Sequence, residues 1–245
     1  MANEGRGRTV AMVNLYSDKD SQDSLKEVSS SLVCKDSFDK ANWDPKLAVM
    51  STVLHEAAHN LGPAHEYKVN GKKDEQIFGG SLASMLEELK AQTSALYFAD
   101  WLVGKNIVTQ EQADGAHFRD VTWSFGHIAE GMVDADNKPK PYSQLASIQM
   151  GALYKAGALV WKADEMAANG KDKGCMSLDF AKWKPAVADL EKIVLHIKGA
   201  GDKAAAEKLK KEFVDDQNPW ADMRKTIQER WLRLPKASFV YAITE

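Results

Sequence analysis

Five consecutive residues, His55-Glu56-Ala57-Ala58-His59, constrain this chain more than any other stretch. On an α-helix, side chains four residues apart project from one face about one turn apart, so both imidazoles can reach one metal ion. Glu56 then lies close enough to act on a water molecule at that ion. This H-E-x-x-H spacing is typical of zinc hydrolases, in which the glutamate is the general base. The motif therefore predicts a helix that carries a catalytic metal site.

The surrounding residues decide whether the motif is meaningful, because five-residue matches also arise by chance. Pro45 suits the first turn of a helix, and Gly62-Pro63 suits its end. Between them, apolar residues recur at helical spacing and predict a buried stripe with the two histidines at its edge. That stripe comprises Leu47, Met50, Leu54, Ala57, Ala58 and Leu61.

The remaining pattern predicts a mainly α fold with minor β-strands near the termini. The β-branched and apolar stretches Thr9–Tyr16 and Ala237–Thr244 read as strands. With 245 residues, 44% of them hydrophobic, the chain suits a single domain, in which residues 1–44 lead into a helical body over residues 45–245. Asp202 and Asn218 read as helix N-caps. Further helices are expected over residues 25–33, 81–103, 109–131, 142–168, 178–197, 202–214 and 219–232.

Composition narrows the partners and the compartment. A net charge of -3 leaves no basic excess to neutralise phosphates, which argues against a nucleic-acid partner. No apolar run approaches the ~20 residues of a membrane span, so no membrane partner is expected. Residues 1–8 lack the apolar segment of a signal peptide, and a cytoplasmic location is expected. The two cysteines, Cys34 and Cys175, match no metal-binding spacing and are expected to be free thiols, with a single disulfide between them as the alternative.

A catalytic zinc takes three protein ligands and leaves a position for water, so the two histidines need a third partner. Residues 55–65 fit the longer pattern H-E-x-x-H-x-x-G-x-x-H, which makes His65 the third ligand of a metzincin-type site. The alternative is a carboxylate from Glu87-Glu88 in the next predicted helix. Such a pair is either a solvated face shared with Lys90 or a group that is aimed at a cation.

The combination of HEAAHNLGP (residues 55–63) with MLEELKAQTSALYF (residues 85–98) resembles the dipeptidyl peptidase III family of zinc metallopeptidases. The H-E-x-x-H spacing is that of the bacterial and plant relatives. Residues 148–159 (IQMGALYKAGAL) are similar to a further segment of that family, although less specifically. Gln92 departs from the family motif E-E-x-[RK]-A-[ED], which has an acid at this position.

The resemblance implies a set of site residues and favours Glu88 over His65 as the third ligand. One zinc ion per chain would be bound by His55, His59 and Glu88. Glu87 would hydrogen-bond His59, and His65 would contact substrate or support the site from outside the ligand set.

The resemblance also implies a mechanism. Glu56 would take a proton from zinc-bound water as the water attacks a carbonyl. The family places a histidine across the cleft to stabilise the oxyanion. Here the equivalent position falls near Tyr142, and His127 is the other candidate, which we favour.

Members of that family have two lobes with the substrate cleft between them, and this chain corresponds only to the metal-bearing helical lobe. The expected function is therefore that of a zinc-dependent hydrolase, with a peptide as the first choice of substrate. Alternatives are a metzincin-type protease, a hydrolase of esters or small acyl substrates, and an inactive fragment that needs a missing second lobe or an oligomeric partner.

Overall fold

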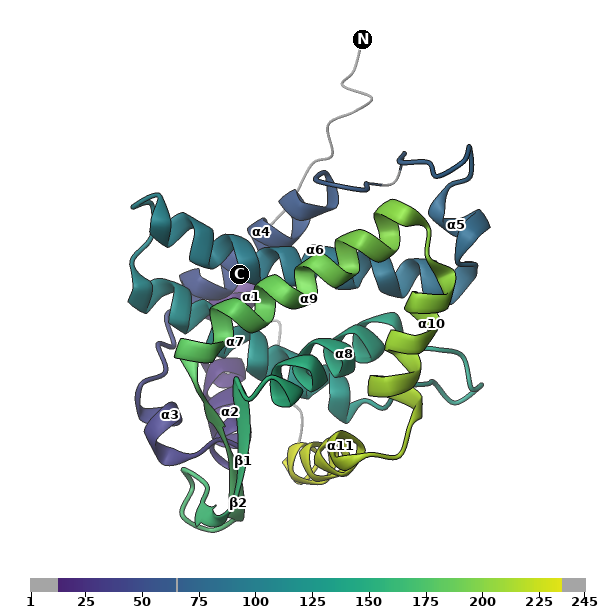
Figure 1. Cartoon of the computed structure of the whole chain (residues 1–245). Helices are drawn as coiled ribbons and strands as arrows, with labels where there is room; N and C mark the ends of the chain where they lie inside the picture. Colours follow the sequence, from purple (N-terminus) through teal and green to yellow (C-terminus); the bar gives the residue numbers. More distant parts are fainter. Residues whose placement is uncertain (1–12, 65, 235–245) are drawn as a thin grey trace, which may run out of the picture.

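The computed structural model describes residues 13–64 and 66–234, and it confirms a mainly helical fold (Figure 1). A two-stranded antiparallel sheet formed by β1 and β2 extends from one end of the helical body. The first eight helices are α1 (Val13–Ser17), α2 (Lys19–Ser30), α3 (Lys35–Asp39), α4 (Pro45–His59), α5 (Asp74–Ile77), α6 (Gly80–Gly104), α7 (Gln110–Ala129) and α8 (Pro141–Lys155). They are followed by β1 (Leu159–Met166), β2 (Lys173–Leu178), α9 (Phe180–Ala200), α10 (Lys203–Lys210), the π-helical stretch η1 (Lys211–Asp215) and α11 (Pro219–Trp231).

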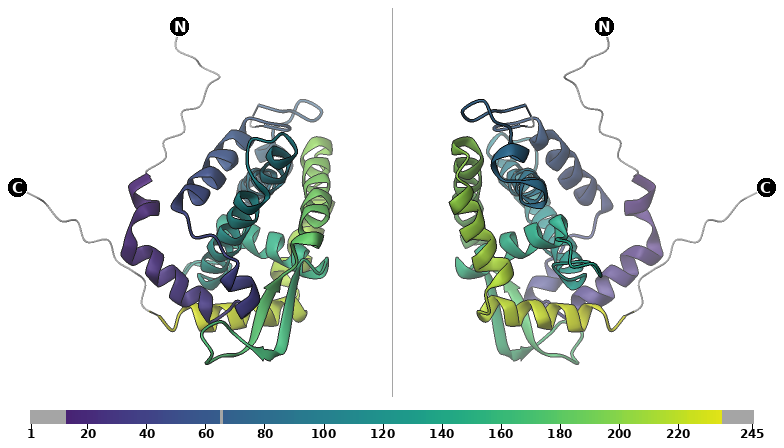
Figure 2. Two further views of the ribbon diagram at one scale, coloured as in Figure 1. Left: turned by 90° about the vertical axis from the view of Figure 1, so that its left-hand side faces the viewer. Right: turned by 90° about the vertical axis from the view of Figure 1, so that its right-hand side faces the viewer.

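Helix α6 is the centre of the molecule. It packs against α4, α8 and α9, and in both side views it runs between α4 and α9 (Figure 2). Its middle is buried on nearly all sides, which is the pattern of a core helix rather than a surface helix. Leu86, Leu89 and Leu96 belong to the main hydrophobic core, so charged side chains on the same helix must find partners inside the protein.

Helix α4 begins where the sequence predicts, but its buried face matches the prediction only in part. Asp44 caps its first turn by accepting a hydrogen bond from the Lys46 N–H. Of the predicted apolar stripe, Leu47 and Ala58 are buried, whereas Ala57 and Leu61 are exposed. Ser51 and His55 are buried beside them, because this face of α4 meets polar groups of α6 and α7 as well as apolar ones.

The single helix predicted over residues 142–168 is wrong in its second half. Helix α8 ends at Lys155, and Gly157 follows in the left-handed conformation with φ +73°. The chain then enters β1, which pairs with β2 from Leu159 opposite Leu178 onward. Gly157 near the end of an apolar run was the local signal for this break.

The predicted strands near the termini are not found where the structure can test them. Val13–Ser17, the end of the first predicted strand, is helical. The rest of that strand and the whole of 237–244 lie outside the described residues. The N-caps at Asp202 and Asn218 are confirmed, because their side chains accept hydrogen bonds from Ala205 and Ala221.

The expectation of two free thiols is also wrong. Cys34 and Cys175 form a disulfide that joins the segment before α3 to strand β2, across 141 residues of sequence. The Cys34 N–H donates to the Met176 carbonyl oxygen and the Met176 N–H donates to that of Leu32, which places the two segments side by side. Disulfides are typical of oxidising compartments, so this bond gives no support to the expected cytoplasmic location. In the described part of the chain, no helix combines the length and apolar character needed to cross a bilayer.

Candidate metal centre

The two histidines of α4 face one another through their Nε2 atoms, which lie 3.1 Å apart. On the other side of each ring, Nδ1 meets a side-chain oxygen of α6. His55 Nδ1 lies 2.8 Å from Gln92 Oε1, and His59 Nδ1 lies 2.8 Å from Glu87 Oε1. Because the oxygens accept, each Nδ1 is the protonated nitrogen, and each Nε2 keeps a lone pair for a metal.

Glu88 supplies a third donor at the same point. Its Oε2 lies 3.2 Å from His55 Nε2 and 3.7 Å from His59 Nε2. This oxygen is buried and accepts no hydrogen bond. Ligands at zinc–ligand distances of about 2.0–2.1 Å in tetrahedral geometry are about 3.3 Å apart, close to the three separations seen here. The donor set of two imidazoles and one carboxylate therefore fits a zinc ion.

Glu87 is fixed by two lysines that have no exposed surface. Lys198 Nζ of α9 lies 2.8 Å from Glu87 Oε2, and Lys90 Nζ lies 3.1 Å from Glu87 Oε1. Burial alone would raise the pKa of Glu87, but the hydrogen bond from His59 and the two ammonium groups hold it well below its usual range. Glu87 is therefore ionised, and its hydrogen bond raises the pKa of His59. The reading of this segment as a solvated charged face is wrong.

Lys90 also ties the end of α4 to α6. Its ammonium donates to the carbonyl oxygens of His59 at 3.3 Å and Leu61 at 3.1 Å. These are carbonyls at the C-terminus of α4, where a positive charge is favourable. The same lysine thus neutralises Glu87 and holds the end of the motif helix in place.

Gln92 belongs to the candidate site, although its position in the sequence predicted no role for it. It follows Glu88 by four residues, so both side chains lie on the face of α6 that looks toward α4. The amide oxygen of Gln92 accepts from His55, as Glu87 accepts from His59. The departure from the family motif therefore places a neutral amide against His55 where the motif has an acid. The i,i+4 spacing from Glu88 was the signal that could have revealed it.

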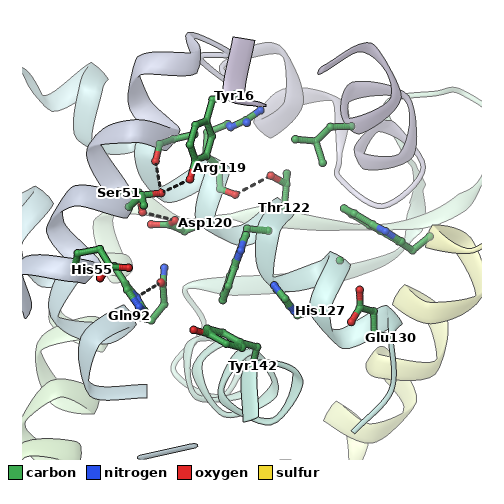
Figure 3. A pocket seen from close by; sticks show the side chains of 17 residues that line it. Tyr16, Ser51, His55, Gln92, Arg119, Asp120, Thr122, His127, Glu130 and Tyr142 are labelled. Atoms are coloured by element: carbon green, nitrogen blue, oxygen red, sulfur yellow. Dashed lines mark hydrogen bonds between the residues drawn. The ribbon is translucent and has the colours of Figure 1, made fainter. Parts of the chain in front are cut away.

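A cavity of about 470 Å³ opens beside these ligands, and Figure 3 shows the side chains that line it. Glu56, His127 and Tyr142 all face this cavity. Burial and the neighbouring Glu88 carboxylate, to which the Tyr142 hydroxyl is hydrogen-bonded, raise the pKa of Tyr142 to about 12. The ring of His127 lies 4.3 Å from that of Trp123 and 5.6 Å from that of Tyr142, measured between centroids. Tyr142 is therefore in direct contact with the third ligand, and His127 packs beside it.

His65, the alternative third ligand, lies outside the described residues. The structure therefore brings together His55, His59 and Glu88 without testing the position of His65.

One known protein is similar to most of this chain in sequence, and two solved structures are similar to most of it in fold. No protein-family model matches. Nudix hydrolase 3 from Arabidopsis thaliana is 24% identical over 216 residues, which are 87% of this chain and 26% of that protein. A structure of DPP III from Caldithrix abyssi matches 90% of this chain and 39% of its own, with a TM-score of 0.73 and 22% identity. Dipeptidyl-peptidase III from Corallococcus sp. strain EGB matches 89% and 37%, with a TM-score of 0.69 and 21% identity.

These matches confirm the resemblance to dipeptidyl peptidase III at the level of the fold. The chain spans about a quarter of the length of its curated relative and less than two fifths of the two solved structures.

Proposed function

We propose that this chain is a zinc-dependent hydrolase that acts on peptide bonds. The observation that carries the proposal is the convergence of His55 Nε2, His59 Nε2 and Glu88 Oε2, three electron-pair donors at separations of 3.1–3.7 Å. The names of the similar proteins, a hydrolase and two dipeptidyl peptidases, support the class of reaction.

His55, His59 and Glu88 would hold a zinc ion, which would supply a Lewis acid able to lower the pKa of water toward ~7 and to polarise a carbonyl group. Glu56 follows a ligand histidine directly on α4 and lines the cavity, so its carboxylate is placed to take a proton from the attacking water. The same carboxyl then delivers that proton to the leaving group. His55 and His59 are kept in the correct tautomer by their partners on α6.

Tyr142 and His127 are the two groups proposed to stabilise the oxyanion. With its pKa raised to about 12, Tyr142 keeps its proton at neutral pH and remains a hydrogen-bond donor. The Glu88 carboxylate is a partner of its hydroxyl, and Tyr142 lines the cavity beside the ligands, where a substrate oxygen would lie. We assign the direct role to Tyr142, with His127 supporting the position of its ring.

The test is Glu56→Gln with zinc content measured on the same sample. We expect one zinc ion per chain in both proteins and a fall in peptide hydrolysis of about 10²–10⁴-fold in the variant. Glu207→Gln, on the exposed side of α10, is the matched control and should change neither quantity. Full hydrolysis by Glu56→Gln at normal zinc content would overturn the mechanism.

The third ligand can be tested in parallel. Glu88→Ala should lose stoichiometric zinc and His65→Ala should retain it, whereas a metzincin-type site would give the reverse. A panel of peptides and esters separates a peptidase from a hydrolase of small acyl substrates. Zinc binding without hydrolysis of either kind would indicate a module that needs a second lobe or a partner chain.

A further inference from the structure

Arg119 of α7 is a buried cation at the cavity, and it has no role in the proposed reaction. It is 9% exposed and lines the same cavity as Glu56 and Tyr142. Its Nη1 is buried and makes no hydrogen bond. Burial lowers the pKa of Arg119, as expected for a charge that has left water without full compensation.

The acidic and polar neighbours of Arg119 are engaged elsewhere. Asp120, the next residue, accepts a hydrogen bond from Ser51 at 2.5 Å, and no described carboxylate forms an ion pair with the guanidinium. The hydroxyl of Tyr16 is hydrogen-bonded to Thr52 at 2.8 Å. The indole of Trp43 lies 5.8 Å from the guanidinium carbon and contributes a cation–π contact only.

Another arginine of this fold shows what a structural role looks like. Arg230 is similarly buried, at 7% exposed, but its guanidinium donates to the carbonyl oxygens of Ser31, Lys173 and Gly174, each at 2.7 Å. Arg119 has no such set of acceptors on its cavity side. A buried guanidinium whose Nη1 has no acceptor suits an anion that enters with a ligand.

The position of Arg119 matches a group that is remote from the reacting bond. Figure 3 shows Arg119 and Tyr16 at one end of the cavity, with His127 and Tyr142 toward the other. Asp120, the residue after Arg119, contacts Ser51 of α4, so Arg119 lies near Ser51 along the axis of α4. His55 follows Ser51 by about one turn, about 6 Å along the helix. An extended peptide advances about 3.3 Å per residue, so this end lies within two or three residues of the metal ligands.

We propose that Arg119 binds a carboxylate of the substrate, two to three residues from the bond that is cleaved. The proposal rests on the proposed function for the location of that bond. The carboxylate is either the C-terminus of a short peptide or the side chain of an acidic residue. Arg119 is then a residue that determines specificity, since it recognises part of the substrate that does not react.

Binding can be measured without turnover in the zinc-loaded Glu56→Gln protein. The probes are tetra-alanine, its C-terminal amide, and an amide in which glutamate replaces the third alanine, titrated by calorimetry. We expect at least one carboxylate-bearing peptide to bind about 10–100-fold more tightly than the tetra-alanine amide. Preference for the free acid identifies the C-terminus as the ligand, and preference for the glutamyl amide identifies the side chain.

Adding Arg119→Met should bring that ratio close to one, and Arg119→Lys should retain part of it. Arg224→Met, which alters a half-buried arginine outside the cavity, is the matched control and should keep the full ratio. Chelator-treated wild-type protein should show the same ratio, because the carboxylate is held by Arg119 rather than by the metal. A ratio near one before Arg119 is changed, or a ratio that survives Arg119→Met, would overturn the proposal.

The melting temperature of the ligand-free protein gives an independent readout. Arg119→Met should leave it unchanged or raise it, since the variant removes a buried charge that lacks full compensation. A large fall would assign Arg119 to stability and overturn the proposal. If no peptide carboxylate is preferred, the proposal for Arg119 fails and the proposed hydrolase function is unaffected. If the wild-type protein neither binds zinc nor hydrolyses peptides, the proposed function fails, and the titrations still test Arg119.

Discussion

Replacing Glu87 by glutamine is expected to lower the free energy of unfolding by about 3–5 kcal/mol, the range for breaking a buried ion pair. Glu87 is 7% exposed and is contacted by His59, Lys90 and Lys198, whose two ammonium groups have no exposed side-chain surface. Hydrogen bonds to charged groups contribute about 1.5–3 kcal/mol each, and three of them acting on one carboxylate do not add fully. Glutamine keeps the shape of Glu87 but removes the charge with which Lys90 pairs, and it leaves Asp74 as the remaining carboxylate partner of Lys198.

The assay is urea unfolding of chelator-treated protein, so that any loss of zinc does not contribute to the difference. Glu212→Gln is the control, since Glu212 pairs with Lys155 on the surface and its loss should cost less than about 1 kcal/mol. In the double variant Glu87→Gln/Lys198→Met, the loss of unfolding free energy should be smaller than the sum of the losses in the two single variants. The reason is that the second substitution removes the ammonium group that Glu87→Gln deprives of a partner. A cost below about 1 kcal/mol for Glu87→Gln would refute the buried-charge account of this cluster.

Two further variants probe the partners of the site. Gln92→Leu removes the acceptor of the His55 Nδ1 proton and should weaken zinc binding about 10–100-fold, measured in competition with a chromophoric chelator. Gln92→Glu should retain tight binding. Equal zinc affinities of the wild type and both variants would contradict the role of Gln92. Burial raises the pKa of Asp120 from 3.8 to about 6, so the folded state holds its proton more tightly, and stability is lost as pH rises from about 4 through 6. The free energy of unfolding of Asp120→Asn should therefore be higher than that of the wild type by up to about 3 kcal/mol at pH 8, and the two should differ little at pH 4. A difference that does not change with pH would exclude the raised pKa of Asp120 as its cause.

The parts of the site that the sequence predicted are those set by local periodicity. His55 and His59 share a face of α4, and Glu88 lies on a neighbouring buried helix, as their spacing and surroundings indicated. Helix starts with a capping side chain, at Asp202 and Asn218, were equally local signals. The resemblance to a known family then selected Glu88 from two candidates, which residue spacing alone did not do.

The parts that were missed depend on contacts between distant segments. Lys198 lies 111 residues after Glu87 in the chain, and Cys34 meets Cys175 across 141 residues. The buried face of α4 was misplaced in part because apolar residues were taken as its inner side, while the structure turns the polar Ser51 and His55 inward. A polar site between helices reverses the usual rule that apolar residues mark the interior.

The disulfide between Cys34 and Cys175 gives the chain a covalent topology that matters for the site. His55, Glu56, His59, Glu88, Gln92 and Tyr142 all lie within the ring that this bond closes. A single backbone cut at the exposed turn of residues 134–137 would therefore leave both halves of the site attached to one another through the sulfur bridge. Such a nicked protein migrates as one species on a denaturing gel until a reductant opens the ring, so the protein can lose a peptide bond while Tyr142 stays attached to the helices that carry the metal ligands.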